Sequence, residues 1–138
     1  MIKNGFARPL VLTVALSVFA LSAGAFGQTT SPSVDPKSVP VIDGAIGSCS
    51  ADFIITDAAN APIYNAKINV HIAYGFGSFH KLDLEVSTNA EGKARFTGLP
   101  NRLKRDLTFH ASEGGREGEV TDDTAKTCNA QFTVALKK

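Results

Sequence analysis

The chain has 138 residues, a length that suits one domain of ordinary size rather than two. Its 14 Lys and Arg residues nearly balance its 13 Asp and Glu residues, which gives a formal net charge of +1. This balance argues against a nucleic-acid partner, because such binding rests on many contacts between basic side chains and phosphates.

Residues 1–27 are predicted to be a cleaved signal peptide. Lys3 and Arg8 give a positively charged start, and an apolar run follows over Leu10–Leu21. Small side chains then stand at the positions that signal peptidase reads before Gln28. An uncleaved membrane anchor is the alternative, although the apolar stretch is borderline in length for a bilayer. We therefore expect a secreted or periplasmic protein that meets a membrane only if this segment stays uncleaved.

Residues 28–48 are predicted to be a flexible tether. Serine, threonine, glycine and three prolines dominate this segment, and large apolar side chains are few. Such a composition does not bury enough apolar surface to order the chain. We therefore place the start of the folded domain at Cys49.

Residues 49–138 are predicted to fold as an all-β sandwich of about seven strands. Short runs alternate apolar and polar residues, turn signals separate them, and no long stretch has helical period. A Gly-rich, charged loop over 113–123 is expected to hold a short edge strand around 118–121. The positions predicted to face inward are Cys49, Ala51, Phe53, Ile55, Ile68, Val70, Ile72, Tyr74, Leu82, Leu84, Val86, Ala94, Phe96, Leu107, Phe109, Ala111, Cys128, Ala130, Phe132, Val134 and Leu136.

The two cysteines are predicted to form a disulfide. Cys49 opens the first of these strands and Cys128 lies in the last, each on the inward set of its strand. Two cysteines in an exported chain most often pair with each other, although free thiols and pairing between chains are alternatives. A bond between them would close a loop of about 80 residues, and in the chain-entropy model such a bond stabilises the fold by roughly 4–5 kcal/mol.

Two segments resemble carboxypeptidase regulatory-like domains. Asp57–Ile68 resembles their strand–turn–strand opening, with Asn60 at the usual Gly. Thr88–Pro100 resembles a segment in which a turn ends in Gly, a short strand ends in Phe, and Gly-Leu-Pro follows. The connection after it, Asn101–Asp106, is longer than is usual there. The resemblance implies an immunoglobulin-like or transthyretin-like β-sandwich that serves as a non-catalytic accessory module.

Three histidines are the only ready candidates for a metal site or a general base. His71, His80 and His110 lack the close spacing of zinc ligands, so we expect no metal, no cofactor and no catalytic residue. His71 and His110 face outward on strands that could be neighbours, which leaves a small metal-dependent or hydrolytic enzyme as the alternative function. Asp83 and Glu85 share an outward face and could join a carboxylate pair.

The segment Tyr74–Phe79 is a candidate partner-contact loop between the second and third predicted strands. Its aromatic residues Tyr74, Phe76 and Phe79 are interleaved with glycines. An exposed aromatic tip would serve as a contact surface, because such anchors dominate interface energies. We expect instead that Phe76 or Phe79 folds back and fills the open end of the sandwich.

The leading functional hypothesis is an exported, non-catalytic module that binds a protein or glycan in the cell envelope or outside the cell through its loops. The absence of Trp makes a sugar-stacking platform less favourable. A purely structural spacer is the third possibility. A short basic cluster, Arg102, Lys104 and Arg105, is interpreted as solvated loop rather than binding site.

Overall fold

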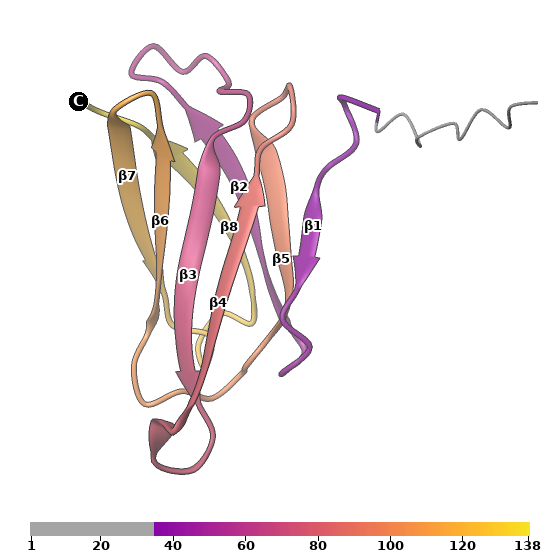
Figure 1. Cartoon of the computed structure of the whole chain (residues 1–138), viewed down its shortest axis with the longest axis vertical. Coiled ribbons are helices and arrows are strands. Elements are labelled where there is room, and N and C mark those ends of the chain that lie inside the picture. The colour runs from indigo at the N-terminus through magenta and orange to yellow at the C-terminus, as the bar shows by residue number, and fades with distance from the viewer. Residues whose placement is uncertain (1–34) are drawn as a thin grey trace, which may run out of the picture. The chain divides into compact units, whose positions relative to one another are not determined.

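The computed structural model describes residues 35–138, which form two four-stranded sheets packed face to face (Figure 1). The predicted signal peptide and the beginning of the predicted tether lie outside the described residues. The all-β sandwich is confirmed, with eight strands instead of about seven. In chain order the elements are β1 (Val41–Asp43), β2 (Cys49–Thr56), β3 (Lys67–Tyr74), the 3-10 turn η1 (Phe76–Ser78), β4 (His80–Ser87), β5 (Lys93–Leu99), β6 (Leu107–Glu113), β7 (Arg116–Asp122) and β8 (Asn129–Ala135).

The strand order is β1-β5-β2-β8 in one sheet and β4-β3-β6-β7 in the other. In the first sheet, β2 pairs antiparallel with β5 and parallel with β8. In the second, β3 pairs antiparallel with both β4 and β6. The edge strand β7 pairs with β6 along its whole length and is longer than the short strand predicted around 118–121. Within residues 35–138, no helix is long and apolar enough to cross a membrane.

The core lies between the two sheets, and the inward faces follow the predicted alternation. Phe53 of β2 and Phe96 of β5 come from one sheet, and Phe109 of β6 comes from the other. All three side chains are fully buried. The ring centroid of Phe109 lies 4.8 Å from that of Phe53 and 5.1 Å from that of Phe96. These aromatic contacts join the two sheets at the centre of the sandwich. Tyr74, Leu82, Cys128 and Phe132 are only partly buried against this core.

The folded unit begins before Cys49, so the predicted end of the tether at residue 48 is wrong. Strand β1 pairs in parallel with β5. Directly after β1, the Gly44 amide donates a hydrogen bond to the Thr97 carbonyl and the Ile46 amide donates one to the Gly98 carbonyl, each at 2.9 Å. Ile42 and Ile46 pack against the core. A three-residue strand is too short to give an alternation signal, and its hydrogen-bond partners lie far away in the sequence.

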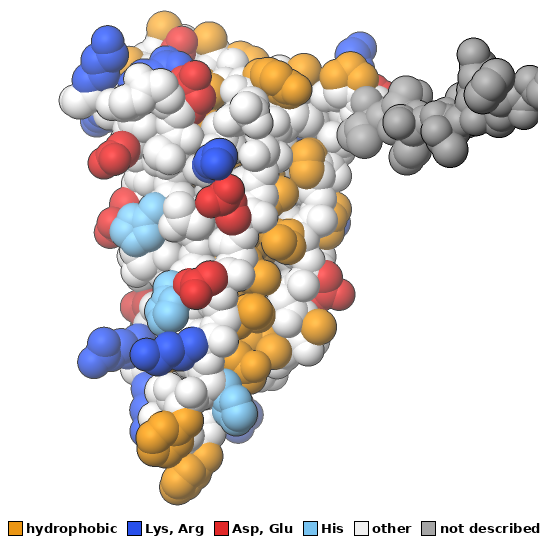
Figure 2. Space-filling model, viewed as in Figure 1, with side chains coloured by type: hydrophobic (Ala, Val, Ile, Leu, Met, Phe, Trp, Pro, Cys, Tyr) orange, Lys and Arg blue, Asp and Glu red, His pale blue; other side chains and the backbone are white. Residues whose placement is uncertain are grey.

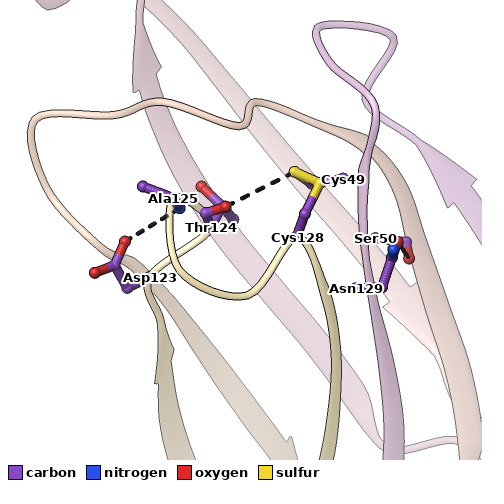
Figure 3. Close-up of a disulfide and its surroundings, with 7 residues drawn as sticks. All are labelled: Cys49, Ser50, Asp123, Thr124, Ala125, Cys128 and Asn129. Atoms are coloured by element: carbon purple, nitrogen blue, oxygen red, sulfur yellow. Dashed lines mark hydrogen bonds between the residues drawn. A yellow bond between two sulfur atoms is a disulfide. The ribbon is translucent and has the colours of Figure 1, made fainter.

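The Cys49–Cys128 disulfide is present, with the two sulfur atoms 2.09 Å apart (Figure 3). Cys49 begins β2, and Cys128 lies directly before β8, so the bond joins two neighbouring parallel strands where both start. The Ser50 amide donates to the Cys128 carbonyl at 2.8 Å, and the Ser50 hydroxyl donates to Asn129 Oδ1 at 2.9 Å. Cys49 Sγ also lies 3.9 Å from the Thr124 carbonyl oxygen. A disulfide sulfur has no hydrogen to donate, so this last approach is a packing contact.

Candidate functional site

The β3–β4 hairpin ends in a tight tip, Gly75–Phe79, which projects from one end of the sandwich (Figure 1). The two strands stay paired up to Tyr74 and His80. Gly75 and Gly77 have φ angles of 78° and 64°, in the left-handed region that favours glycine. The Ser78 amide donates to the Gly75 carbonyl at 3.1 Å, and the Phe79 amide donates to the Phe76 carbonyl at 3.4 Å. The tip is therefore a preformed turn rather than a loose loop.

Phe76 and Phe79 are exposed, so the expectation that one of them fills the open end of the sandwich is wrong. Their side chains are 94% and 80% exposed. Leu103, from the loop between β5 and β6, packs partly against the core and lines a depression together with Gly77 and Ser78 of the tip. The Phe79 ring lies over its own turn, because a Cβ atom added to Gly77 would stand 2.6 Å from that ring.

Tyr74 has a different position from the two phenylalanines. It is partly buried against the core, and its ring stacks on the His80 ring with centroids 5.3 Å apart. A Cβ atom at Gly75 would stand 2.7 Å from the same His80 ring. Tyr74 and His80 therefore close the base of the tip, and only Phe76 and Phe79 present apolar surface to solvent at its end.

A basic band lies beside the tip. We use this name for Arg102, Lys104 and Arg105 of the β5–β6 loop; Lys104 and Arg105 line an open depression with Gly77 and Ser78. Figure 2 shows hydrophobic side chains at the lower end of the viewed face, below a group of Lys and Arg side chains. The closeness of this cluster to the tip could not be predicted from the sequence, because the two are separated in the chain. Leu103, an apolar residue inside a charged loop, was the available signal.

Ionic pairing distinguishes the basic band from most other basic side chains of the described residues. Within residues 35–138, Arg102, Lys104 and Arg105 make no ion pair, and the adjacent acidic residue is Asp106. The basic side chains that do have a carboxylate partner are Lys67, Lys93, Arg95, Arg116 and Lys126. Lys37, Lys81, Lys137 and Lys138 also lack an ion pair within residues 35–138, but only the basic band places three unpaired basic side chains beside the exposed phenyl rings.

Two histidine–carboxylate pairs lie on the outer face of the β4-β3-β6-β7 sheet. His71 Nδ1 is 2.6 Å from an Asp83 carboxylate oxygen, and His110 Nδ1 is 3.1 Å from one of Glu119. His71 and His110 line one open depression, as neighbouring strands would allow. Asp83 and Glu85, the candidates for a carboxylate pair, each have a separate basic partner, with Glu85 binding Lys67 at 3.4 Å. Within residues 35–138, no three His, Cys, Asp or Glu side chains are grouped to hold a metal ion.

The pKa values of Asp52 and Asp122 are shifted in opposite directions. Arg95 donates hydrogen bonds of 2.5 and 2.7 Å to the two carboxylate oxygens of Asp52, and this contact lowers the pKa of Asp52. Asp122 is 3% exposed, and its Oδ2 atom lacks a hydrogen-bond partner among the described residues. Burial raises the pKa of Asp122, and the nearby charges of Asp123 and Asp106 raise it further.

The sequence matches no protein-family profile and no curated protein. Among solved structures, it is similar to 3-chlorocatechol 1,2-dioxygenase from Rhodococcus opacus 1CP, with a TM-score of 0.46 and 14% identity over 79% of this chain and 70% of that chain. Chlorocatechol 1,2-dioxygenase from Pseudomonas putida gives a TM-score of 0.45 and 12% identity over 78% of this chain and 70% of that chain. Catechol 1,2-dioxygenase from Pseudomonas arvilla C-1 gives 0.44 and 13% over 76% of this chain and 60% of that chain. At these values the likeness carries no conclusion about activity.

Proposed function

We propose that this chain is an exported, non-catalytic β-sandwich module that binds a partner in the cell envelope or outside the cell, and that the β3–β4 tip is its contact surface. The exposure of Phe76 and Phe79 at the end of a preformed turn carries the proposal. Covering one phenyl ring stabilises a complex by roughly 1.5–3 kcal/mol relative to leaving it in water. A rigid turn adds to this, because little conformational entropy is lost when it binds.

Export and an accessory role rest on other observations. The signal-peptide pattern of residues 1–27 supports export, and so does the disulfide, because such bonds persist in oxidising compartments. The resemblance of Asp57–Ile68 and Thr88–Pro100 to carboxypeptidase regulatory-like domains supports a module that serves other machinery.

A binding comparison with envelope fractions tests the tip. The protein is incubated with total envelope fractions, and the bound share is measured for the wild type and for the double variant Phe76→Ser/Phe79→Ser. We expect at least a tenfold loss of affinity, with a melting temperature close to that of the wild type because the rings contribute little to the core. Equal binding by the two proteins would refute the tip as contact surface.

Tyr64→Ser is the matched control for this comparison. Tyr64 is a large aromatic residue that is 66% exposed. It lies in the connection that leads into β3, whereas the tip follows the other end of that strand. We expect its replacement to leave binding unchanged. A structural spacer would show no specific binding with any of the three proteins.

The alternative is a small hydrolytic or metal-dependent enzyme built on the outward histidines. The 2.6 Å contact between His71 and Asp83 favours it, because a carboxylate that orients a histidine is a common arrangement for a general base. An activity or bound metal that is present in the wild type and lost in both His71→Ala and His110→Ala would support this alternative. Activity and metal content that do not change in either variant would remove it.

A further inference from the structure

We propose that the partner of the tip is an anionic lipid surface. Phe76 and Phe79 enter the boundary between lipid headgroups and acyl chains, and the basic band contacts the lipid phosphates. This inference rests on the proposed function, since it names the partner class of the same tip. It differs from membrane contact through residues 1–27, because it uses the folded sandwich.

The projecting shape of the tip favours binding to a fluid lipid layer over binding to a matching pocket on a protein partner. The two exposed rings stand on a narrow hairpin end that projects from the sandwich (Figure 1). A protein partner would need a matching cavity for such a projection, whereas the bilayer interface accepts apolar side chains without one. Of the two residues between the rings, Gly77 has no side chain and Ser78 adds only a small hydroxyl group.

Part of the backbone of the tip is already hydrogen-bonded within the turn. An amide that leaves water without a partner opposes insertion. The Ser78 and Phe79 amides already donate to the carbonyls of Gly75 and Phe76 within the same turn. The turn keeps these two hydrogen bonds when water is replaced by lipid, and the Phe76 and Gly77 amides, which have no partner among residues 35–138, can remain at the level of the polar headgroups.

The charge beside the tip complements an anionic surface. Arg102, Lys104 and Arg105 have no ion pair among residues 35–138, so their charges are available to phosphates. Aromatic rings at the end of a projection, with basic side chains set behind them, match the layering of a membrane, where acyl chains lie beneath anionic headgroups. A nucleic acid would need far more phosphate contacts than this short cluster offers.

Vesicle co-sedimentation tests the inference. The vesicles are phosphatidylcholine alone, or phosphatidylcholine with about 30% phosphatidylglycerol, at near-physiological salt where exposed charges interact over roughly 8 Å. We expect binding to the anionic vesicles and at least a tenfold loss of affinity in Phe76→Ser/Phe79→Ser. Lys104→Glu/Arg105→Glu is expected to lose at least tenfold as well, whereas Lys104→Arg keeps wild-type binding because it keeps the charge. Tyr64→Ser is the control for a remote aromatic residue.

A fluorescence measurement checks insertion directly. The chain contains no Trp, so Phe79→Trp introduces a single reporter. We expect its emission to shift to shorter wavelength when anionic vesicles are added, and Tyr64→Trp to show no shift. The mass of each purified protein is measured first, because a retained apolar segment at Leu10–Leu21 would bind lipid by itself. Such binding would be the same in the tip variants and the wild type.

The outcomes separate the inference from the proposed function. No binding to anionic vesicles, together with tip-dependent binding to envelope fractions, would overturn the lipid partner and point to a protein or glycan at the same tip. Equal binding to neutral and anionic vesicles would overturn the role of the basic band. Vesicle binding that survives Phe76→Ser/Phe79→Ser would overturn insertion of the rings.

Discussion

At the scale of single residues, a side chain added at a glycine can destabilise the fold through backbone strain or through lack of space. Two glycines of the described chain distinguish these two causes. Gly98 and Gly115 have φ angles of 64° and 75°. A Cβ atom at Gly98 would stand 2.0 Å from Asp43 Oδ1, whereas nothing lies within 4 Å of one at Gly115. We predict that Gly115→Ala lowers the free energy of unfolding by about 1 kcal/mol, the usual cost of this conformation, and that Gly98→Ala lowers it by about 3 kcal/mol. Urea unfolding measures both, and equal losses would mean that the contact with Asp43 is relieved without cost.

Asp52 is predicted to stabilise the fold only above acidic pH. Its pKa in the folded protein lies below the unfolded value, so its contribution is present above about pH 4 and is lost as the pH falls through the folded pKa. Because the pair with Arg95 is partly exposed, Asp52→Asn should cost no more than about 1 kcal/mol at pH 7. The difference in melting temperature from the wild type should disappear toward pH 2.

Asp122 is predicted to lower the stability of the fold at neutral pH, which is the opposite of the effect of Asp52. Its folded pKa lies above the unfolded value, so the folded state resists ionisation as the pH rises beyond about 4. Asp122→Asn removes this buried charge and should raise the free energy of unfolding by about 1 kcal/mol at pH 7, with little effect near pH 3. Thermal unfolding of both variants between pH 2 and pH 8 checks the two signs. A destabilised Asp122→Asn at pH 7 would contradict this account.

At the scale of the elements, the short β1 segment is predicted to be part of the stable fold. Ile42 and Ile46 are partly buried against the core, while Val41 is 57% exposed. Replacing either isoleucine by Ala should cost about 1–2 kcal/mol, less than a fully buried site, and Val41→Ala should cost less than about 0.5 kcal/mol. Chemical unfolding measures the difference. The Gly44 and Ile46 amides should also exchange slowly with solvent, and fast exchange would argue that β1 is not held against β5.

The sequence allowed prediction of those elements whose signal is local. The alternation in β3 was clean because each inward residue meets the same core, and every predicted position from Ile68 to Ile72 is buried. The positions of Phe76 and Phe79 could not be predicted in this way. Whether a loop aromatic covers the core depends on competing side chains, and here Leu103 from another loop packs against the core while both phenylalanines are exposed. The glycines at Gly75 and Gly77 did indicate a tight turn, and that part of the candidate site was foreseeable.

At the scale of the whole molecule, the disulfide is predicted to supply a large share of the stability. It closes a loop with a sequence separation of 79, which corresponds to about 4–5 kcal/mol in the chain-entropy model. Cys49→Ala/Cys128→Ala should lose about that much free energy of unfolding, a large fraction for a domain of this size. Calorimetry of the oxidised, reduced and double-variant proteins measures it. A loss below about 1 kcal/mol would show that the unfolded chain is already compact without the bond.

The pairing of strands across the molecule lay beyond sequence reasoning. The alternation of apolar and polar residues predicts which face of a strand is buried, but it does not predict which strands lie beside it. Cys49 was correctly predicted to open a strand, and Cys128, predicted within the last strand, lies directly before it. Nothing local indicated that β2 and β8 run side by side in parallel. The basic band was assigned to solvent for the same reason, because its closeness to the tip depends on how the β5–β6 loop crosses the end of the sandwich.

The position of the disulfide also decides how the molecule would respond to being pulled by its two ends. Tension entering before β1 reaches Cys49, crosses the sulfur–sulfur bond to Cys128, and leaves along β8. The residues between the two cysteines, which include the whole β4-β3-β6-β7 sheet and the tip, lie outside this path. Stretching could strip β1 and β8 from their neighbours without lengthening the enclosed chain. An oxidised molecule would therefore lengthen only by the residues outside the two cysteines, and the tip would stay folded under load.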